Sequence, residues 1–334
     1  MRVLGIETSC DETAAAVLDD GRILSNVVSS QIALHREFNG VVPELAARAH
    51  LQKIYPVIDA ARRQAGAEKI HAVAYTRGPG LLGPLLVGKV AAQAISLMEK
   101  IPLVPVNHLE GHVFAAEFEN SLEFPLIALI VSGGHTDLLL CRGPGRYRVL
   151  GRTRDDAAGE AYDKVARLLG LGYPGGPVVD KAARRGNPKA VDLPRPYMPD
   201  TWDFSFAGLK TAVLYYLRDC GSKTLTAGQI DDICASFQEA VADTLVTKAM
   251  AAARRFRVKS AVIGGGVAAN SRLRELSAAR GQELGLKVAM PTPRLCTDNG
   301  AMIARVAWHR LKAGAVERRY RSDPGLPVRS WVRR

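Results

Sequence analysis

Two stretches of the chain each consist of a short apolar run, a small polar tip and a second apolar run. The first covers residues 3–18 with its tip at 9–12, and the second covers residues 126–141 with its tip at 132–136. Short apolar runs that meet at Gly, Ser and Asp predict β-hairpins. The stretches lie about 120 residues apart, roughly one domain length, so we expect a duplicated architecture with both tips facing one cleft.

Between and after these hairpins, apolar periodicity alternates between helix and strand. Helices are predicted at 43–65, 83–98, 160–169, 177–185 and 231–255, and strands at 70–75, 103–106, 260–263 and 287–290. This alternation predicts an α/β fold with mixed sheets. Residues 184–205 hold four prolines and little periodicity, so we expect a surface excursion there. A length of 334 residues suggests two domains.

The chain is strongly basic. Its 45 Lys and Arg against 33 Asp and Glu give a net charge of +12. Five arginines lie within residues 142–154, four cations lie within 254–259, and Arg318, Arg319 and Arg321 lead into a basic C-terminal end. A polyanion partner is plausible on this basis, but a basic surface without such a partner would look the same. Aromatic residues make up only 6%, and no aromatic-rich platform for single strands is visible.

Features of secretion and membrane insertion are lacking. Glu7 interrupts the N-terminal apolar stretch before a signal-peptide core could form, and no apolar run reaches the roughly 18 residues of a membrane span. The five cysteines are scattered and form no Cys-x-x-Cys pair. We therefore expect a cytoplasmic protein with reduced thiols and no membrane association.

His108 and His112 are the strongest candidates for metal chemistry. Four residues apart on a helix, they lie on one face and can hold one ion, although such pairs also occur by chance. Glu110 lies two residues from each histidine, about 200° around the helix from His108, so the general base of a zinc protease is misplaced. Asp298 precedes a predicted helix and is either a simple N-cap or the missing oxygen ligand.

Three glycine-rich segments could approach a nucleotide. Residues 132–136 and 264–270 each follow an apolar strand, where free backbone amides favour a phosphate, although an ordinary turn is the alternative for the first. Residues 83–89 match the first part of the phosphate-loop pattern, but Val90 stands where the pattern has the Ser or Thr that holds magnesium. The same stretch has helical periodicity, so we do not expect a phosphate loop there.

Taken together, nine motifs resemble those of one family. They are, in order, 6–13 (IETSCDET), 78–81 (GPGL), 107–112 (NHLEGH), 131–136 (VSGGHT), 159–164 (GEAYDK), 173–177 (YPGGP), 204–210 (FSFAGLK), 264–270 (GGGVAAN) and 296–301 (CTDNGA). The chain thereby resembles the bacterial TsaD proteins, formerly called Gcp and related to eukaryotic OSGEP. The resemblance spans almost the whole chain, whereas the C-terminal residues 331–334 are less familiar.

The resemblance implies an actin/Hsp70/sugar-kinase-like (ASKHA) fold, with two ribonuclease-H-like domains around a central cleft. We expect residues 1–120, completed by 318–334, to form the first domain and residues 121–317 the second. It also implies transfer of a threonylcarbamoyl group from threonylcarbamoyl-adenylate to N6 of the tRNA adenosine 3′ to the anticodon, in tRNAs reading codons that begin with A, with release of AMP. Rival functions are an ATPase or kinase of the same fold, a metalloprotease and a non-enzymatic scaffold.

Specific residues receive roles through the same resemblance. One divalent metal per subunit, iron(II) or zinc, would be held by His108, His112 and Asp298. The adenylate site would be lined by Val131, Ser132, Gly133, Gly134, Asp163, Gly176, Asp180 and Asn270. Apart from the resemblance, we expect Asp11 or Glu12, on the first hairpin tip, to accept the amine proton, with a helix-dipole or substrate-orienting role as the alternative. The implied partners are tRNA, threonylcarbamoyl-adenylate and TsaB-like and TsaE-like proteins.

Overall fold

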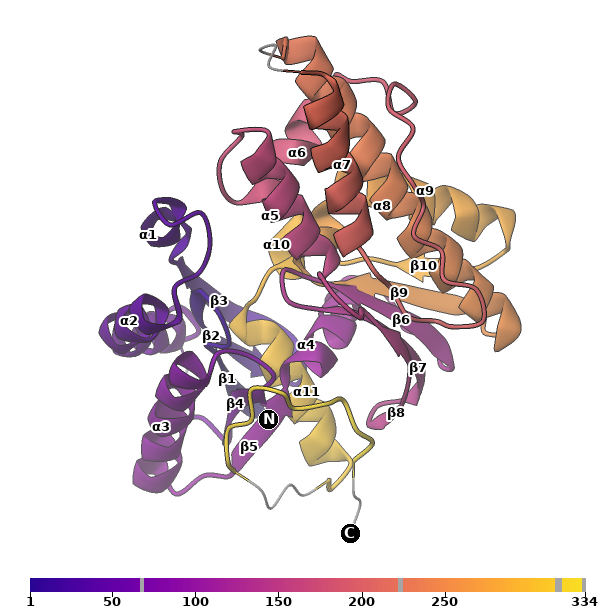
Figure 1. Cartoon of the computed structure of the whole chain (residues 1–334). Helices are drawn as coiled ribbons and strands as arrows, with labels where there is room; N and C mark the ends of the chain where they lie inside the picture. Colours follow the sequence, from indigo (N-terminus) through magenta and orange to yellow (C-terminus); the bar gives the residue numbers. More distant parts are fainter. Residues whose placement is uncertain (67–68, 222–224, 316–319, 332–334) are drawn as a thin grey trace. The chain divides into compact units, whose positions relative to one another are not determined.

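A computed structural model of the chain describes residues 1–66, 69–221, 225–315 and 320–331 (Figure 1). These residues form two compact units. The first unit consists of Met1–Glu119, Gly143–Tyr147 and Thr297–Arg334, and the second of Asn120–Arg142 and Arg148–Cys296. Each unit has a hydrophobic core of its own.

A five-stranded mixed sheet forms the centre of the first unit, in the order β3-β2-β1-β4-β5. Its strands are β1 (Arg2–Glu7), β2 (Glu12–Asp19), β3 (Arg22–Ser30), β4 (Ala72–Gly78) and β5 (Leu103–Asn107). The helices are α1 (Ile32–Arg36), α2 (Pro43–Gln64), α3 (Leu82–Glu99), α4 (His108–Ala115), the 3-10 turn η1 (Ala116–Phe118) and α11 (Gly300–Lys312). Strand β1 pairs antiparallel with β2 and parallel with β4. The first predicted hairpin is confirmed.

The second unit repeats this plan with the sheet order β10-β9-β6-β7-β8. Its strands are β6 (Leu126–Val131), β7 (Thr136–Gly143), β8 (Arg146–Arg152), β9 (Ser260–Gly264) and β10 (Lys287–Ala289). The helices are α5 (Ala158–Leu168), α6 (Gly175–Ala183), α7 (Ala207–Asp219), α8 (Ala227–Arg255), η2 (Gly266–Ala269), α9 (Ser271–Glu283) and α10 (Pro293–Cys296). Strand β6 pairs antiparallel with β7 and parallel with β9, as β1 does with β2 and β4. The duplicated α/β architecture is therefore confirmed.

Helix α11 belongs to the first unit, whereas we expected the second domain to extend to residue 317. The helix packs directly on β1 because both contact positions are glycines. A Cβ atom on Gly5 would lie 2.3 Å from the carbonyl oxygen of Gly300. This close packing places the boundary between Cys296 and Thr297. Residues 316–319 and 332–334, which include four arginines of the basic C-terminal end, lie outside the described residues.

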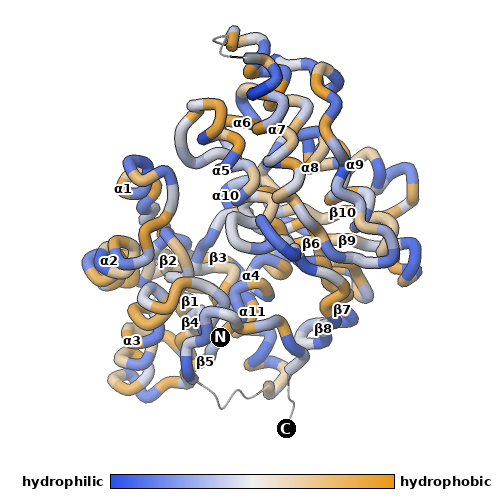
Figure 2. Tube along the Cα trace, in the orientation of Figure 1, coloured by the Kyte–Doolittle hydropathy of each residue, from blue (hydrophilic) through white to orange (hydrophobic). Residues whose placement is uncertain are grey.

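The apolar pattern predicted most buried elements and missed the exposed ones. Strands β3 and β8 were not predicted, because each lies at a sheet edge and exposes many of its residues. Helix α7 was also missed. Helix α8 begins four residues earlier than expected, since Thr226 and Gln229 form a capping box. In Figure 2 the strands of both sheets carry hydrophobic residues, while hydrophilic residues gather in outer loops.

The irregular segment at 184–205 is more than a surface excursion. Phe204 near its end is fully buried. The buried Lys248 of α8 donates hydrogen bonds to the carbonyl oxygens of Met198 and Thr201, at 3.5 and 3.3 Å, and also bonds the carbonyl oxygen of Asp203. A lysine that donates to carbonyl oxygens fixes this segment on the helix without a carboxylate.

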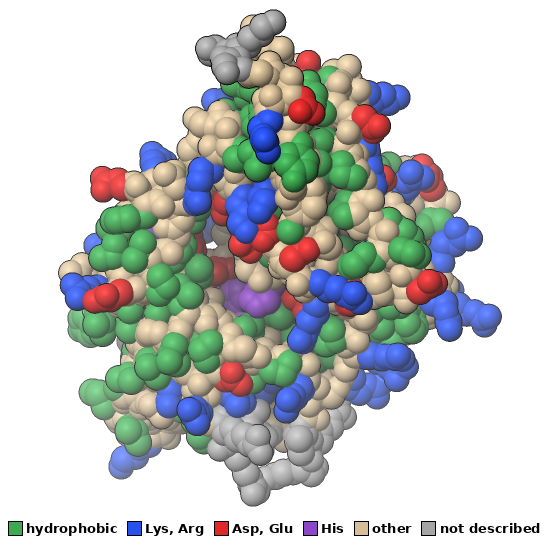
Figure 3. Space-filling view, in the orientation of Figure 1, with side chains coloured by type: hydrophobic (Ala, Val, Ile, Leu, Met, Phe, Trp, Pro, Cys, Tyr) green, Lys and Arg blue, Asp and Glu red, His purple; other side chains and the backbone are tan. Residues whose placement is uncertain are grey.

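Helices α2 and α3 expose apolar side chains on the outside of the first unit. Leu51 and Tyr55 of α2 and Val90, Leu97 and Met98 of α3 are all more than half exposed. Figure 3 shows hydrophobic side chains gathered on the left of the molecule, where these two helices lie. Among the described helices, none is long and apolar enough to cross a membrane. Apolar side chains exposed on these two neighbouring helices make this part of the first unit a candidate contact surface.

Candidate functional site

His108 and His112 lie on the short helix α4, which begins directly after β5. The helix start is fixed by Asn107, whose side-chain oxygen accepts a hydrogen bond from the Leu109 amide at 2.9 Å. Both imidazoles are buried, and their Nε2 atoms lie 3.1 Å apart. The spacing of four residues thus places two nitrogen atoms at one point on the helix face.

Asp298 completes this cluster from the other end of the chain. Its Oδ1 atom lies 3.3 Å from Nε2 of His112 and 3.5 Å from Nε2 of His108. The N-cap of α11 is the neighbouring Asn299, whose side chain accepts a hydrogen bond from the Met302 amide at 3.1 Å. The interpretation of Asp298 as a simple N-cap is therefore wrong, and its carboxylate faces the histidines.

The three side chains fit a single divalent ion. Metal–nitrogen bonds of about 2.0–2.1 Å in a tetrahedral site place ligand atoms roughly 3.3 Å apart, close to the separations seen here. Glu7, which is fully buried, lies with Oε2 3.1 Å from Nδ1 of His108. Because a carboxylate only accepts, Nδ1 of His108 is the donor in this contact, and in the neutral ring Nε2 is the nitrogen that can bind a metal. Two imidazoles and one carboxylate suit zinc or iron(II).

The charge around the cluster also favours a cation. Burial lowers the pKa of His108, but the carboxylates of Asp298 and Glu7 outweigh burial and raise this pKa to about 9. The surroundings therefore stabilise positive charge at the imidazole, and a metal ion would supply the same charge.

The first hairpin tip carries two more carboxylates, Asp11 and Glu12. Burial, together with the charges of Asp11 and Asp298, raises the pKa of Glu12 to about 10. Burial and the neighbouring carboxylates thus favour the protonated form of Glu12, so the tip holds two carboxyl groups in close electrostatic contact.

The Gly78–Leu81 segment supports this tip. The Leu81 amide donates a hydrogen bond to the Ser9 carbonyl oxygen at 2.8 Å. A Cβ atom on Gly80 would lie 2.5 Å from the same oxygen, and one on Gly88 would lie 2.3 Å from the Thr8 hydroxyl. Residues 83–89 lie inside helix α3, as expected, so the resemblance to a phosphate loop ends there. The glycines instead allow α3 to pack closely against the tip.

Glu110 serves the structure of the first unit. Its Oε1 atom accepts a hydrogen bond from Arg310 at 3.0 Å. Its Oε2 atom accepts from Trp331 at 2.7 Å and from Tyr147 at 3.2 Å. With both oxygens occupied away from the metal ligands, Glu110 is not the general base of a protease.

In the second unit, two glycine-rich segments meet at the carboxyl ends of parallel strands. Strands β6 and β9 are paired up to Ile130 and Gly264. A Cβ atom on Gly265 would lie 2.3 Å from the carbonyl oxygen of Val131. Around Gly133 and Gly134, an added Cβ would meet no atom within 4 Å. This end of the sheet therefore presents open backbone of the kind that binds phosphates in α/β folds.

The polar residues assigned to the adenylate site are held by hydrogen bonds. Asp163 accepts one from the Gly175 amide at 2.7 Å. Asp180 accepts from the Ser271 amide and hydroxyl at 3.0 and 2.7 Å. Asn270 is the N-cap of α9 and donates to Oε1 of Gln238 at 2.7 Å. Asp180 and Asn270 thus meet at the start of α9, while an added Cβ on Gly176 would meet nothing within 4 Å.

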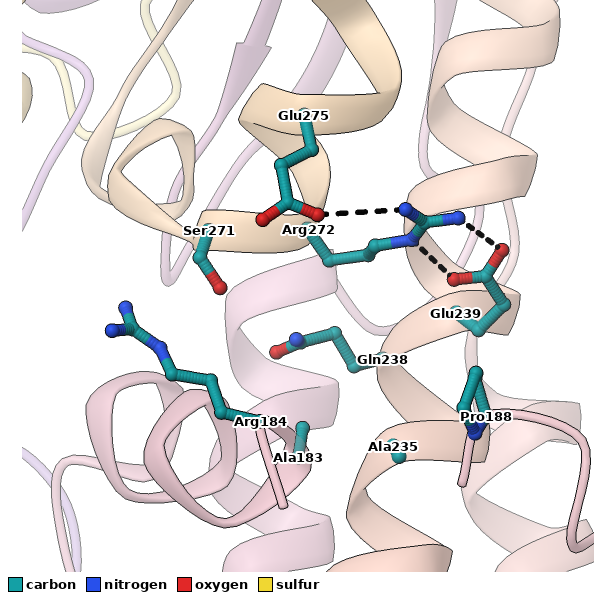
Figure 4. A pocket seen from close by; sticks show the side chains of 9 residues that line it. All are labelled: Ala183, Arg184, Pro188, Ala235, Gln238, Glu239, Ser271, Arg272 and Glu275. Carbon is teal, nitrogen blue, oxygen red and sulfur yellow. Dashed lines mark hydrogen bonds and ion pairs between the residues drawn. The ribbon is translucent and has the colours of Figure 1, made fainter. Parts of the chain in front are cut away.

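A pocket of about 340 Å³ with both charged and apolar lining lies beside these residues (Figure 4). It is lined by Ala183, Arg184, Pro188, Ala235, Gln238, Glu239, Ser271, Arg272 and Glu275. Two hydrogen bonds of 2.5 and 3.0 Å join the Arg272 guanidinium to Glu239, which holds its plane fixed. The sequence did not point to Gln238, Glu239 and Arg272 as site residues. They lie on α8 and α9, and only tertiary packing brings these two helices together. Glu7 was missed as a partner of His108 for the same reason.

Comparison with known proteins identifies the family. Residues 22–305 match the family model TsaD, described as tRNA N6-adenosine threonylcarbamoyltransferase. The curated protein of this name from Endomicrobium trichonymphae is 48% identical over 99% of both chains. That from Symbiobacterium thermophilum is 54% identical over 93% of this chain and 92% of its own. The chain belongs to the TsaD family.

Solved structures support the fold expected for a TsaD chain. HypF from T. kodakarensis matches 93% of this chain and 48% of its own, with a TM-score of 0.64 and 16% identity. Component A of (R)-2-hydroxyglutaryl-CoA dehydratase from Acidaminococcus fermentans matches 93% and 99%, with a TM-score of 0.54. At such identities the likeness concerns the fold alone. It confirms the predicted α/β fold of the actin/Hsp70/sugar-kinase type.

Proposed function

We propose that this chain transfers the threonylcarbamoyl group of threonylcarbamoyl-adenylate to N6 of the adenosine 3′ to the anticodon, in tRNAs reading codons that begin with A. The proposal rests on membership of the TsaD family, at about half identity over nearly the whole chain. The adenosine N6 attacks the carbamoyl carbon, the bond from this carbon to the phosphate oxygen breaks, and AMP leaves. N6 loses one proton, which Asp11 or Glu12 on the first hairpin tip would accept.

In this proposal the second unit binds the adenylate. The amides of Ser132, Gly133 and Gly134 would receive the phosphate, since added Cβ atoms on the two glycines would meet nothing. Asp163 and Asp180 would accept ribose hydroxyls, and Gly176 and Asn270 would lie along the nucleoside. Because hydrogen bonds already orient these side chains, they would lose little further conformational entropy when the donor binds. Well-oriented reactants can gain roughly 7–11 kcal/mol of the barrier in this way.

We further propose that His108, His112 and Asp298 hold one iron(II) or zinc ion. When bound, such an ion stabilises negative charge that develops on oxygen during acyl transfer. The ligand separations and the surrounding carboxylates support this assignment. Glu7 would keep the His108 ring in the orientation that directs Nε2 to the ion.

TsaB-like and TsaE-like proteins are the proposed partners, working with this chain in the cytoplasm. The apolar surface of α2 and α3 supports a protein partner, because Leu97 and Met98 are 78% and 83% exposed. When another protein covers large apolar side chains that are otherwise in contact with water, the free energy of the system falls.

A transfer assay tests the proposed function. The purified metal-loaded chain is mixed with threonylcarbamoyl-adenylate and unmodified tRNA, with and without the TsaB-like and TsaE-like proteins. We expect AMP and threonylcarbamoyl-adenosine to appear in equal amounts, faster when the partners are present. Absence of the modified nucleoside under every condition would contradict the function, and an equal rate without partners would contradict their role. Casein in a parallel sample should remain uncut.

Replacing Glu7 with Gln should weaken metal binding by about 10–100-fold, the usual effect of losing the carboxylate that orients a metal-binding histidine. The measurement is a competition titration with a chromophoric chelator. Thr76→Val is the matched control, because Thr76 donates a hydrogen bond to the same carboxylate and does not contact the histidines. Restored affinity in Glu7→Asp would support an orienting role. Equal affinity of Glu7→Gln and the unmodified chain would refute it.

A further inference from the structure

A group of cations surrounds one aromatic ring at the surface of the second unit. Phe256 directly follows helix α8 and is half-buried. The guanidinium carbons of Arg148, on β8, and Arg255 lie 6.0 and 5.9 Å from the centre of its ring. The ring of Trp202 packs 6.3 Å away. Arginines that lie over an aromatic ring are held in place by cation–π attraction while their N–H groups stay available.

Further cations extend this surface, which we call the Phe256 patch. The patch consists of Arg148, Arg254, Arg255, Phe256, Arg257 and Lys259, and its five cations are exposed. In the sheet, Ser260 pairs with Leu126, which in turn pairs with Cys141. Lys259 and Arg142 therefore lie at the same end of the sheet. Figure 3 shows Lys and Arg side chains gathered at the lower right, in the region of β7, β8 and the end of α8.

The cations of the patch form no direct ion pairs in the described part of the chain; Glu123, whose pKa is lowered chiefly by its hydrogen bond from Lys287, also feels the charge of Lys259. Among the described residues, no carboxylate forms an ion pair with any of its five cations. The neighbouring arginines differ in this respect. Arg152 is paired with Asp137 and Arg154 with Asp203, each at 2.9 Å. The patch is thus a local excess of positive charge, and such a surface attracts anions.

Structural roles account for only part of this charge. Cations in the last turn of α8 stabilise the helix dipole, which explains Arg254 and Arg255. Charged residues also protect sheet edges, but the edge of β8 is already covered at Arg152, whose carbonyl oxygen accepts a hydrogen bond from the Phe204 amide. Neither role requires Arg148, Arg257 and Lys259.

We propose that the Phe256 patch binds the sugar-phosphate backbone of the tRNA substrate. This inference rests on the proposed function for the identity of the RNA. Guanidinium groups match phosphate oxygens in a two-pronged geometry, and those around Phe256 are already oriented by the ring. Phosphate contacts position an RNA without reading its sequence, so the patch would contribute affinity and leave the chemistry to other residues.

The test combines Arg148→Gln, Arg255→Gln and Arg257→Gln in the full chain. Binding of unmodified tRNA is measured at several salt concentrations. Each lost phosphate contact lowers the slope of log affinity against log salt by about 0.7–0.9, so the slope should fall by about two units and affinity by roughly tenfold or more at moderate salt. The KM for tRNA should rise, while the rate at saturating tRNA and the binding of AMP stay unchanged.

The matched control removes three exposed cations elsewhere in the same unit, with Lys189→Gln, Arg218→Gln and Arg280→Gln. It should bind tRNA within about twofold of the unmodified chain. An unchanged salt slope in the patch variant, or an equal loss in the control, would overturn the proposal. If the unmodified chain binds tRNA through the patch but transfers no group, the proposed function fails and the patch stands. If transfer occurs and the patch variant binds normally, only the patch fails.

Discussion

Replacing His108 with Ala should remove the bound metal and lower threonylcarbamoyl transfer by about 100-fold or more, since losing one charge-stabilising group from an active site costs on this order. The Nε2 atoms of His108 and His112 lie 3.1 Å apart, and neither His112 nor Asp298 can replace the missing ligand from its own position. Metal content is measured by elemental analysis of protein purified without oxygen, and transfer by nucleoside analysis of the tRNA.

The fold should survive this substitution. His108 lies on a helix of eight residues, and truncating one buried side chain typically costs about 1–3 kcal/mol. Binding of AMP, which we assign to the second unit, should therefore persist and shows that the variant is folded. His71→Ala is the control, because His71 is exposed and lies at the other end of the sheet from the cluster. If the His108→Ala variant transferred the group at the full rate without bound metal, the proposal that the metal takes part in the reaction would be wrong.

Replacing Gly159 with Ala should weaken AMP binding by about 10–100-fold, because a shift of about 1 Å in a binding loop can cost this much. A Cβ atom on Gly159 would lie 2.6 Å from the Ser132 carbonyl oxygen and 2.8 Å from backbone atoms of Gly133. These are backbone atoms of the loop that we expect to hold the phosphate, so the loop itself must move. Isothermal titration with AMP measures the loss.

Gly208→Ala is the matched control for this substitution. Gly208 also lies on a helix of the second unit, and an added Cβ there would meet no atom within 4 Å. Alanine should leave AMP binding unchanged and stabilise that helix by less than the roughly 0.5–1 kcal/mol of a helix interior, because Gly208 is the second residue of α7. Metal content should stay the same in both variants. If Gly159→Ala binds AMP as tightly as Gly208→Ala, then the loop position does not depend on this contact.

Local periodicity in the sequence determined much of this molecule. The alternation of apolar runs gave the central strands of both sheets and the two hairpins. Edge strands such as β3 left no such pattern, because water contacts much of their surface. The spacing of four residues placed His108 and His112 together, since a helix turns by about 100° per residue wherever it forms. The order of nine motifs along the chain pointed to the TsaD family, which the comparisons confirm.

Tertiary structure decided which distant residues meet. Asp298 reaches the histidines because Gly5 and Gly300 allow α11 to pack directly on β1, and that packing also assigns α11 to the first unit. Glu7 meets His108 only because β1 and the start of α4 lie in one unit, and Gln238 meets Asn270 across two helices. Sequence periodicity fixes positions within an element. Contacts between elements depend on how closely their backbones approach. At Gly5 and Gly300, the absence of a side chain allows that close approach.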